Sequence, residues 1–186
     1  MSTFVAQAPK RHLHTVADYY RMAAAGILRP DERTELIEGE IIDMAPIGSR
    51  HASVVTKLTL ELQRVVNDRA IVRVQNPVRL GDLSEPQPDL ALLRPRADFY
   101  RDAHPGPADI LLIIEVADTS LDYDRNTKLP LYARHGVPEV WLVDLVASTV
   151  ERFLDPAQAA YRRRDLLSAA AAPSLLPGCT IRLDAF

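Results

Sequence analysis

The chain has 186 residues, 47% hydrophobic and 25% charged, with one cysteine and a formal net charge of −3. The length favours a single domain, the apolar fraction excludes a wholly disordered chain, and the single cysteine excludes a disulfide framework. The negative net charge is not the strongly basic balance expected of a protein that binds nucleic acid non-specifically. No apolar run could span a membrane and no secretory signal is evident, so we expect a soluble cytoplasmic protein. In chain order, residues 1–14 are predicted to form a flexible segment and residues 15–186 a single domain.

The first predicted elements are a short helix and a hairpin. Thr15 provides an N-cap with Asp18 at the third helical position, and Gly26 is a stop signal, which together predict a helix over residues 16–25. The segment LIEGEIIDM, residues 36–44, predicts two short strands joined by a tight turn.

The following segment predicts a long helix and then several strands. Ser49 can cap a helix over residues 50–67, whose apolar side chains recur at helical spacing on a stripe that includes His51. Residues 125–135 predict another helix, which Gly136 stops. Strand-like runs occupy residues 71–80, 89–93, 110–116, 139–144 and 149–153. This order indicates an α/β domain with a mixed β-sheet flanked by helices.

Two acidic residues mark the ends of buried strands. Asp89 opens the apolar run in QPDLALL, and Glu115 ends the apolar run ILLIIEV. A buried carboxylate is costly unless a cation or hydrogen bonds compensate it, and pairing of the two strands would bring both acids together. Mg²⁺ or Mn²⁺ is the simplest compensating charge. For either acid alone, the alternatives are an arginine partner for Glu115 and a turn cap for Asp89.

Lys128 is the third candidate for a functional residue. In a helix that begins near Asp124, the side chains of Asp124, Lys128 and Tyr132 lie on one face. An inward Lys128 could orient a water or stabilise a developing oxyanion. The alternatives are a solvated surface lysine and an aspartate that caps the helix.

Three other polar residues have both a structural and a functional interpretation. His51, at the start of the long predicted helix, is either a packed core histidine or a contact for a phosphate. Glu35 and Glu40 bracket the predicted hairpin, and one of them could face the interior of the sheet. The alternative is an exposed strand residue, which we expect for at least one of the two. The sequence contains no P-loop, no dinucleotide-binding fingerprint, no HExxH and no nucleophile elbow.

Taken in order, four segments carry a family pattern. The segments RTELIEGEIIDM, GSRHASVVTKLTLEL, QPDLALL and LLIIEVADTSLDYDRNTKLPLYARHGVPEVWLVD resemble the Uma-type restriction endonuclease family of bacteria, within the PD-(D/E)XK nuclease superfamily. The match extends from about Glu35 to Phe153, and LLPGCTIRLDAF is similar to the family's terminal segment. The resemblance implies a restriction-endonuclease-like core and a Mg²⁺-dependent phosphodiesterase site that acts on DNA.

The resemblance also implies roles for particular residues. Asp89 is similar to the superfamily's PD aspartate, and Glu115 to its second metal-binding acid. The superfamily's usual lysine, two residues after the glutamate, is replaced by Ala117, whereas the family's lysine on the following helix matches Lys128. The matched segments also contain four candidate supporting residues, which are Glu40, His51, Asp124 and Tyr132.

Two hypotheses follow for the function. The first is a Mg²⁺- or Mn²⁺-dependent DNA endonuclease with Asp89, Glu115 and Lys128 as catalytic residues. The second is a catalytically degenerate relative that binds nucleic acid or a partner protein through the same pocket. An endonuclease that cuts two strands is expected to form a homodimer, for which the candidate apolar surface is Trp141, Leu142 and Val143. Because the net charge is negative, DNA binding would need a local basic patch, with candidates Arg50, Lys57, Arg94, Arg96 and Arg101.

Overall fold

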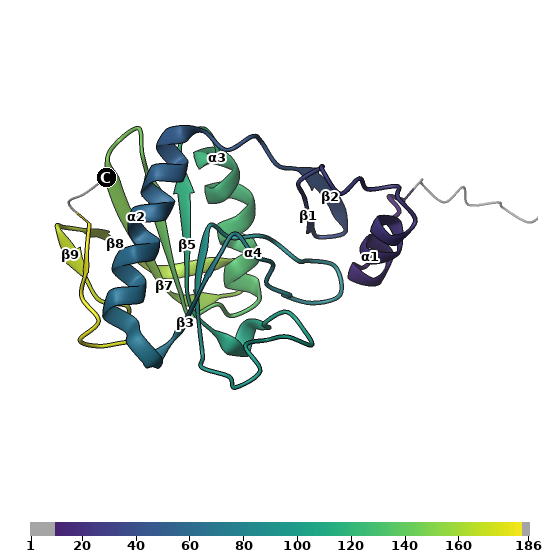
Figure 1. Ribbon diagram of the computed structural model, residues 1–186. Coiled ribbons are helices and arrows are strands. Elements are labelled where there is room, and N and C mark those ends of the chain that lie inside the picture. The colour runs from purple at the N-terminus through teal and green to yellow at the C-terminus, as the bar shows by residue number, and fades with distance from the viewer. Residues whose placement is uncertain (1–9, 184–186) are drawn as a thin grey trace, which may run out of the picture.

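The structure, a computed structural model, describes residues 10–183 and is a mixed α/β fold built on a six-stranded sheet (Figure 1). The strands lie in the order β3-β4-β5-β6-β7-β8, and all neighbours are antiparallel except the parallel pair β5 and β6. The fold class predicted from the sequence is confirmed. The strands are β3 Ile71–Val74, β4 Leu90–Leu93, β5 Ile110–Ala117, β6 Glu139–Asp144, β7 Thr149–Ala157 and β8 Ala160–Leu167.

Helices cover both faces of this sheet (Figure 1). On one face lies α2, Ser49–Val66, and on the other lie α3, Leu121–Tyr123, a π-helix, Asp124–Lys128, and α4, Leu129–Arg134. Because successive side chains of a strand point to opposite faces, Leu112 and Ile114 of β5 pack in the core beneath α2, whereas Ile113 packs in the core beneath α4. The same alternation turns Glu115 towards the π-helix and α4.

The N-terminal elements attach to the side of the main sheet. The helix α1, Val16–Ala24, has the predicted capping box between Thr15 and Asp18. The hairpin consists of β1, Thr34–Ile37, and β2, Glu40–Asp43. It is tied to the loop before β4, since Glu85 N donates to the carbonyl of Leu36 at 2.7 Å. Near the C-terminus, β9, Ala170–Ala171, pairs with β10, Ile181–Arg182, beside α2 (Figure 1).

Several expectations about local structure are corrected. The N-cap of α2 is Gly48 instead of Ser49, and no side chain forms a capping hydrogen bond at this end of the helix. The predicted strand over residues 71–80 ends at Val74, because Gln75 adopts a left-handed backbone with φ of 50°. The strand β8 was not predicted, because its exposed, arginine-rich sequence lacks an apolar alternation.

The surface expected for a homodimer is also corrected. Trp141, Leu142 and Val143 belong to β6, in the interior of the sheet, and all three are buried. They therefore offer no apolar surface to a second copy.

Residues 1–9 of the predicted flexible segment lie outside the described residues, whereas His14 N donates to the carbonyl of Gly39 at 2.9 Å. Within residues 10–183, no helix is long and apolar enough to cross a membrane.

Candidate active site

The two acids that the sequence placed at strand ends are neighbours in the structure. In the antiparallel pair β4 and β5, Leu90 lies opposite Ile114, so the residue before β4 meets the residue after Ile114. The backbone amide of Asp89 donates to Glu115 Oε2 at 3.3 Å. The strand register thus places both carboxyl groups at one end of the sheet.

Asp89 is held by donors from three separate elements. His51 Nε2, in the first turn of α2, lies 3.0 Å from Asp89 Oδ2, and the amide of Val116 donates to the same oxygen at 2.9 Å. Gln75 Nε2 donates to Oδ1 at 3.2 Å. Burial raises the pKa of Asp89, but the hydrogen bond and charge of His51 and the hydrogen bonds from Val116 and Gln75 together outweigh this, so the pKa lies below its ordinary value. The bond to Asp89 in turn raises the pKa of His51.

Glu115 occupies a buried position against the helices of the opposite face. The hydroxyl of Tyr132 donates to Glu115 Oε1 at 2.5 Å, and Lys128 Nζ lies 3.3 Å from the same oxygen. Burial raises the pKa of Glu115 to about 8, although the Lys128 ammonium opposes this shift. The carboxylate form of Glu115 therefore gains from any additional positive charge nearby.

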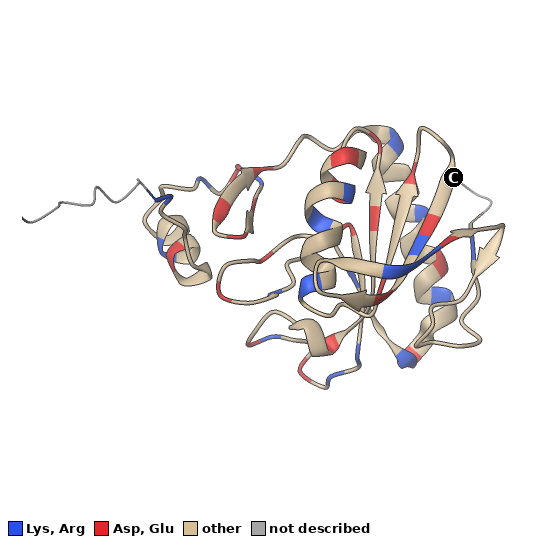
Figure 2. Ribbon diagram, turned by 180° about the vertical axis from the view of Figure 1, so that it is seen from behind, with Lys and Arg blue, Asp and Glu red and all other residues tan. Residues whose placement is uncertain are grey.

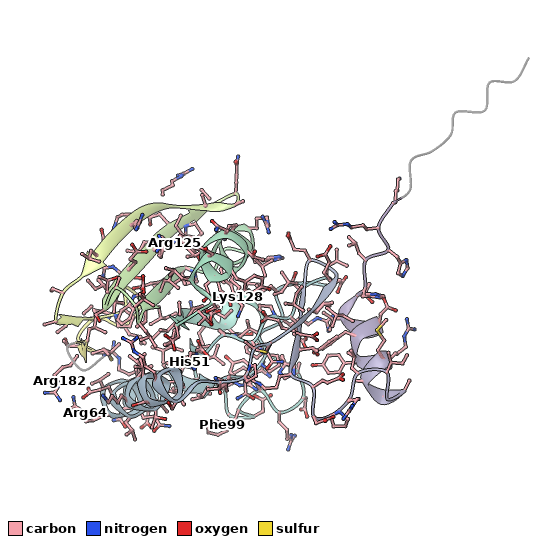
Figure 3. All side chains as sticks on the ribbon, turned by 90° about the horizontal axis from the view of Figure 1, so that it is seen from above. His51, Arg64, Phe99, Arg125, Lys128 and Arg182 are labelled. Atoms are coloured by element: carbon pink, nitrogen blue, oxygen red, sulfur yellow. The ribbon has the colours of Figure 1, made fainter. Side chains whose placement is uncertain are left out.

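Lys128 points into the protein, as its position on the predicted helix face suggested. Its side chain is 6% exposed, and its Nζ lies 3.3 Å from both Glu35 Oε2 and Glu115 Oε1. Burial lowers the pKa of Lys128, but the surrounding carboxylates raise it above its ordinary value. Asp124 shares the π-helix with Lys128 and is also buried, and the hydroxyl of Ser120 donates to it at 2.6 Å. Figure 3 shows His51 on α2 and Lys128 on the helical segment across from it.

Glu40 lies apart from the other candidate site residues. Its side chain is 49% exposed and pairs with Arg11, so it does not reach the acids at the sheet end. Glu35 does reach them: it is buried, it contacts Lys128, and its Oε2 accepts from the amide of Gln87 at 3.0 Å. Of the two glutamates that bracket the hairpin, Glu35 therefore belongs to the cluster.

Gln75 is a residue that the sequence did not indicate. It directly follows β3, and its left-handed backbone accompanies the hydrogen bond from its side chain to Asp89. A non-glycine residue in this conformation stores strain, which occurs often at functional sites. The sequence carries no signal for such a conformation at a glutamine.

The predicted basic patch does not form around the site. Arg94, Arg96 and Arg101 follow β4 at the end opposite Asp89, and Arg96 and Arg101 pair with aspartates of their own loop. Arg50 is closer to the acids, because its Nη1 lies 3.8 Å from Oδ1 of Asp118, which lines the same cleft as Asp89 and Glu115. Lys57 lies in the middle of α2. Figure 2 shows acidic and basic residues interspersed over the ribbon.

The acids line a cleft of about 450 Å³ at this end of the sheet. Facing them are Arg33, Lys128 and the imidazole of His51. The acidic lining residues are Glu35, Asp43, Asp89, Glu115, Asp118 and Asp124. Negative charge is thus in excess, and burial raises the pKa of Asp124 as it does that of Glu115.

This donor set fits a hard divalent cation. The acidic side chains of the cleft offer carboxylate oxygens, which suit Mg²⁺ or Mn²⁺ as ligands. In the part of the chain that the structure describes, no three His, Cys, Asp or Glu residues are arranged to hold a metal ion. Mg²⁺ sites commonly use one or two carboxylates and complete their coordination with water and substrate phosphate, so the pair Asp89 and Glu115 suffices in number.

Comparison with known proteins places the chain in a family. A family model named Uma2 and described as "Putative restriction endonuclease" matches residues 16–184. A solved structure of similar fold is titled a putative nuclease belonging to DUF820 from Anabaena variabilis ATCC 29413, with a TM-score of 0.69 and 17% sequence identity. The similarity covers 91% of this chain and 95% of that one and concerns the fold alone. No curated protein matches the chain. Because the family model spans nearly the whole chain, the protein belongs to the Uma2 family of restriction endonuclease-like proteins.

Proposed function

We propose that the protein is a metal-dependent nuclease that hydrolyses phosphodiester bonds in DNA. The observation that carries this proposal is the placement of Asp89, just before β4, beside Glu115, near the end of β5, with the buried ammonium of Lys128 next to Glu115. Membership of the Uma2 family supports a nuclease, and so does the nuclease title of the structural neighbour.

Asp89 and Glu115 would hold the metal ion, Mg²⁺ or Mn²⁺. When bound, such an ion lowers the pKa of a coordinated water and neutralises charge on a phosphate. The excess of carboxylates in the cleft supports this assignment, since the protein's own cations do not balance them. His51 and Gln75 keep Asp89 ionised and fixed in orientation through their hydrogen bonds.

Lys128 would stabilise the charge that develops on the phosphate. An ammonium has three N–H donors, and in this structure Glu35 and Glu115 lie within reach of two of them. Because Lys128 also lines the cleft, its ammonium can donate to a phosphate oxygen or a water there. Glu35 and Glu115 together hold the ammonium in place, and the hydroxyl of Tyr132 holds Glu115. A donor fixed in advance stabilises the transition state without the cost of reorganisation.

A cleavage assay tests this function. Labelled single-stranded, duplex and branched DNA are incubated with the protein in Mg²⁺, Mn²⁺ or EDTA, and products are resolved on denaturing gels. Asp89→Asn and Glu115→Gln should reduce cleavage to background. The matched control is Glu40→Gln, which makes the same chemical change at an exposed carboxylate and should cleave like the wild type. Full activity in either cleft variant, or in EDTA, would contradict the assignment.

Calorimetric titration with Mn²⁺ separates the enzyme from the degenerate relative. The proposed nuclease binds Mn²⁺ in the wild type and loses this binding in Asp89→Asn. A protein that binds DNA but neither binds Mn²⁺ nor cleaves is the non-catalytic alternative.

A further inference from the structure

A second hollow lies beside the cleft, between α2 and the edge strand β3. It has a volume of about 340 Å³. Because β3 is the edge strand of the six-stranded sheet, no further strand of that sheet covers this side. We name it the α2–β3 groove, and its lining residues are Ile47, Ala52, Val55, Thr56, Thr59, Leu60, Val74 and Gln75.

We propose that the α2–β3 groove binds an unpaired nucleobase next to the phosphate that is cleaved. This inference rests on the proposed nuclease function and names its substrate class, which is single-stranded or locally unpaired DNA. The base would lie between the side chains of α2 and the end of β3, and its phosphate would lie in the cleft.

The groove is continuous with the candidate active site. Ile47 and Gln75 line both hollows. Gln75 Nε2 also donates to Asp89 Oδ1 at 3.2 Å, so the groove begins one side chain away from a proposed metal ligand. A strand whose phosphate reaches Asp89 therefore brings an adjacent nucleotide to the mouth of the groove.

The chemistry of the groove complements a base and not a phosphate. None of its lining residues is charged, whereas the lining of the cleft is charged and has more acidic than basic side chains. The hydroxyls of Thr56 and Thr59 donate back to helix carbonyls at 2.8 and 2.7 Å, so these donors are engaged within α2. Ile47 and Leu60 are 43% and 63% exposed and add apolar surface at which the face of a ring can pack.

The shape of the groove selects unpaired DNA. A volume of this size lies at the lower end of pockets that enclose small organic ligands, and a nucleobase is such a ligand. A base inside a duplex is stacked on both faces and must leave the stack before it can enter a pocket. The engaged threonine donors leave little for reading base edges, so binding is expected to tolerate every base.

A matched pair of variants on α2 tests the subsite. Ala52 and Ser53 are both exposed neighbours in the same helical turn, but only Ala52 lines the groove. Ala52→Trp fills the groove, and Ser53→Trp makes the same change in side chain outside it. Affinity for a short fluorescein-labelled single strand is measured by anisotropy, with Ca²⁺ replacing Mg²⁺. Because stacking of one base is worth about 1–3 kcal/mol, Ala52→Trp should weaken binding roughly 5- to 150-fold, and Ser53→Trp should not.

A scan with abasic nucleotides provides a test that needs no variant. One abasic residue is placed at each position of the strand in turn. In the wild type, one position at a fixed distance from the cleavage site should lose affinity by a similar factor. In Ala52→Trp the same substitution should cause no further loss, because the groove is already filled.

The outcomes separate the subsite from the nuclease function. Equal affinity of Ala52→Trp and Ser53→Trp, or no sensitive abasic position, overturns the subsite while wild-type cleavage leaves the nuclease function intact. If the wild type neither binds nor cleaves any DNA, both proposals fail. If Ala52→Trp instead converts a dimer into a monomer in sedimentation, the occupant is a second copy of the chain and the subsite is refuted.

Discussion

Replacing Lys128 by methionine should destabilise the protein by about 3 kcal/mol. The ammonium lies 3.3 Å from Glu35 and from Glu115, and all three side chains are buried. When both groups are ionised, each pair attracts with about 5 kcal/mol at an effective dielectric constant of about 20, and burial of the charges offsets much of this. Removing one partner of a buried pair costs about 3–5 kcal/mol. We expect the lower end, because burial already raises the pKa of Glu115 to about 8, so removal of the ammonium leaves Glu35 as the main uncompensated charge.

Urea denaturation measures this loss. Fluorescence can follow unfolding through Trp141, the single tryptophan, which is buried in β6. Lys10→Met, at an exposed lysine, is the control and should change stability by less than about 0.5 kcal/mol. The double variant Lys128→Met/Glu35→Gln should recover part of the loss, because it removes one of the uncompensated buried charges. A Lys128→Met protein as stable as the wild type, or a double variant less stable than the single one, would refute this account.

Three further predictions concern the cluster and the sheet. The hydrogen bond to Asp89 raises the pKa of His51 above its ordinary value of 6.5. Protonated His51 therefore stabilises the folded protein fully below about pH 6.5, and this stabilisation is lost as the pH rises through the raised pKa. The Tm difference between wild type and His51→Gln should therefore be larger at about pH 5.5 than at about pH 8.5. Glu35→Gln should reduce cleavage about 10- to 100-fold, whereas Glu40→Gln should not, as gel assays of both would show. Glu139→Ala leaves the buried indole donor of Trp141 unpaired and should cost about 1–3 kcal/mol in urea denaturation; an unchanged midpoint would contradict this.

Much of the fold could be predicted from local patterns. The apolar runs of β5 and β6 are continuous because both faces of these strands are buried. The apolar stripe predicted for α2 forms the buried face of that helix. The strand β8 escaped prediction because an exposed edge strand has no buried face to impose an alternation. The left-handed backbone of Gln75 likewise has no counterpart in the sequence.

The choice between Glu35 and Glu40 shows where sequence reasoning ends. In the register of the hairpin, Glu35 lies opposite Ile42 and Glu40 opposite Ile37, so both glutamates point to the same face. Alternation therefore cannot separate them. Glu35 lies beside Gln87 and Lys128, whereas Glu40 lies at the turn, next to Arg11. Only the docking of the hairpin against the loop before β4 decides between them.

The sequence by itself determined the α/β class and the positions of Asp89 and Glu115 beside apolar strands, because a buried strand appears in the sequence as a continuous apolar run. The tertiary structure decided what surrounds those acids: the buried contacts of Lys128, the part played by Gln75, and the uncharged groove that runs from the cleft along α2. These features join residues far apart in the chain. Their physical cause is the packing of separate elements, which no local pattern encodes.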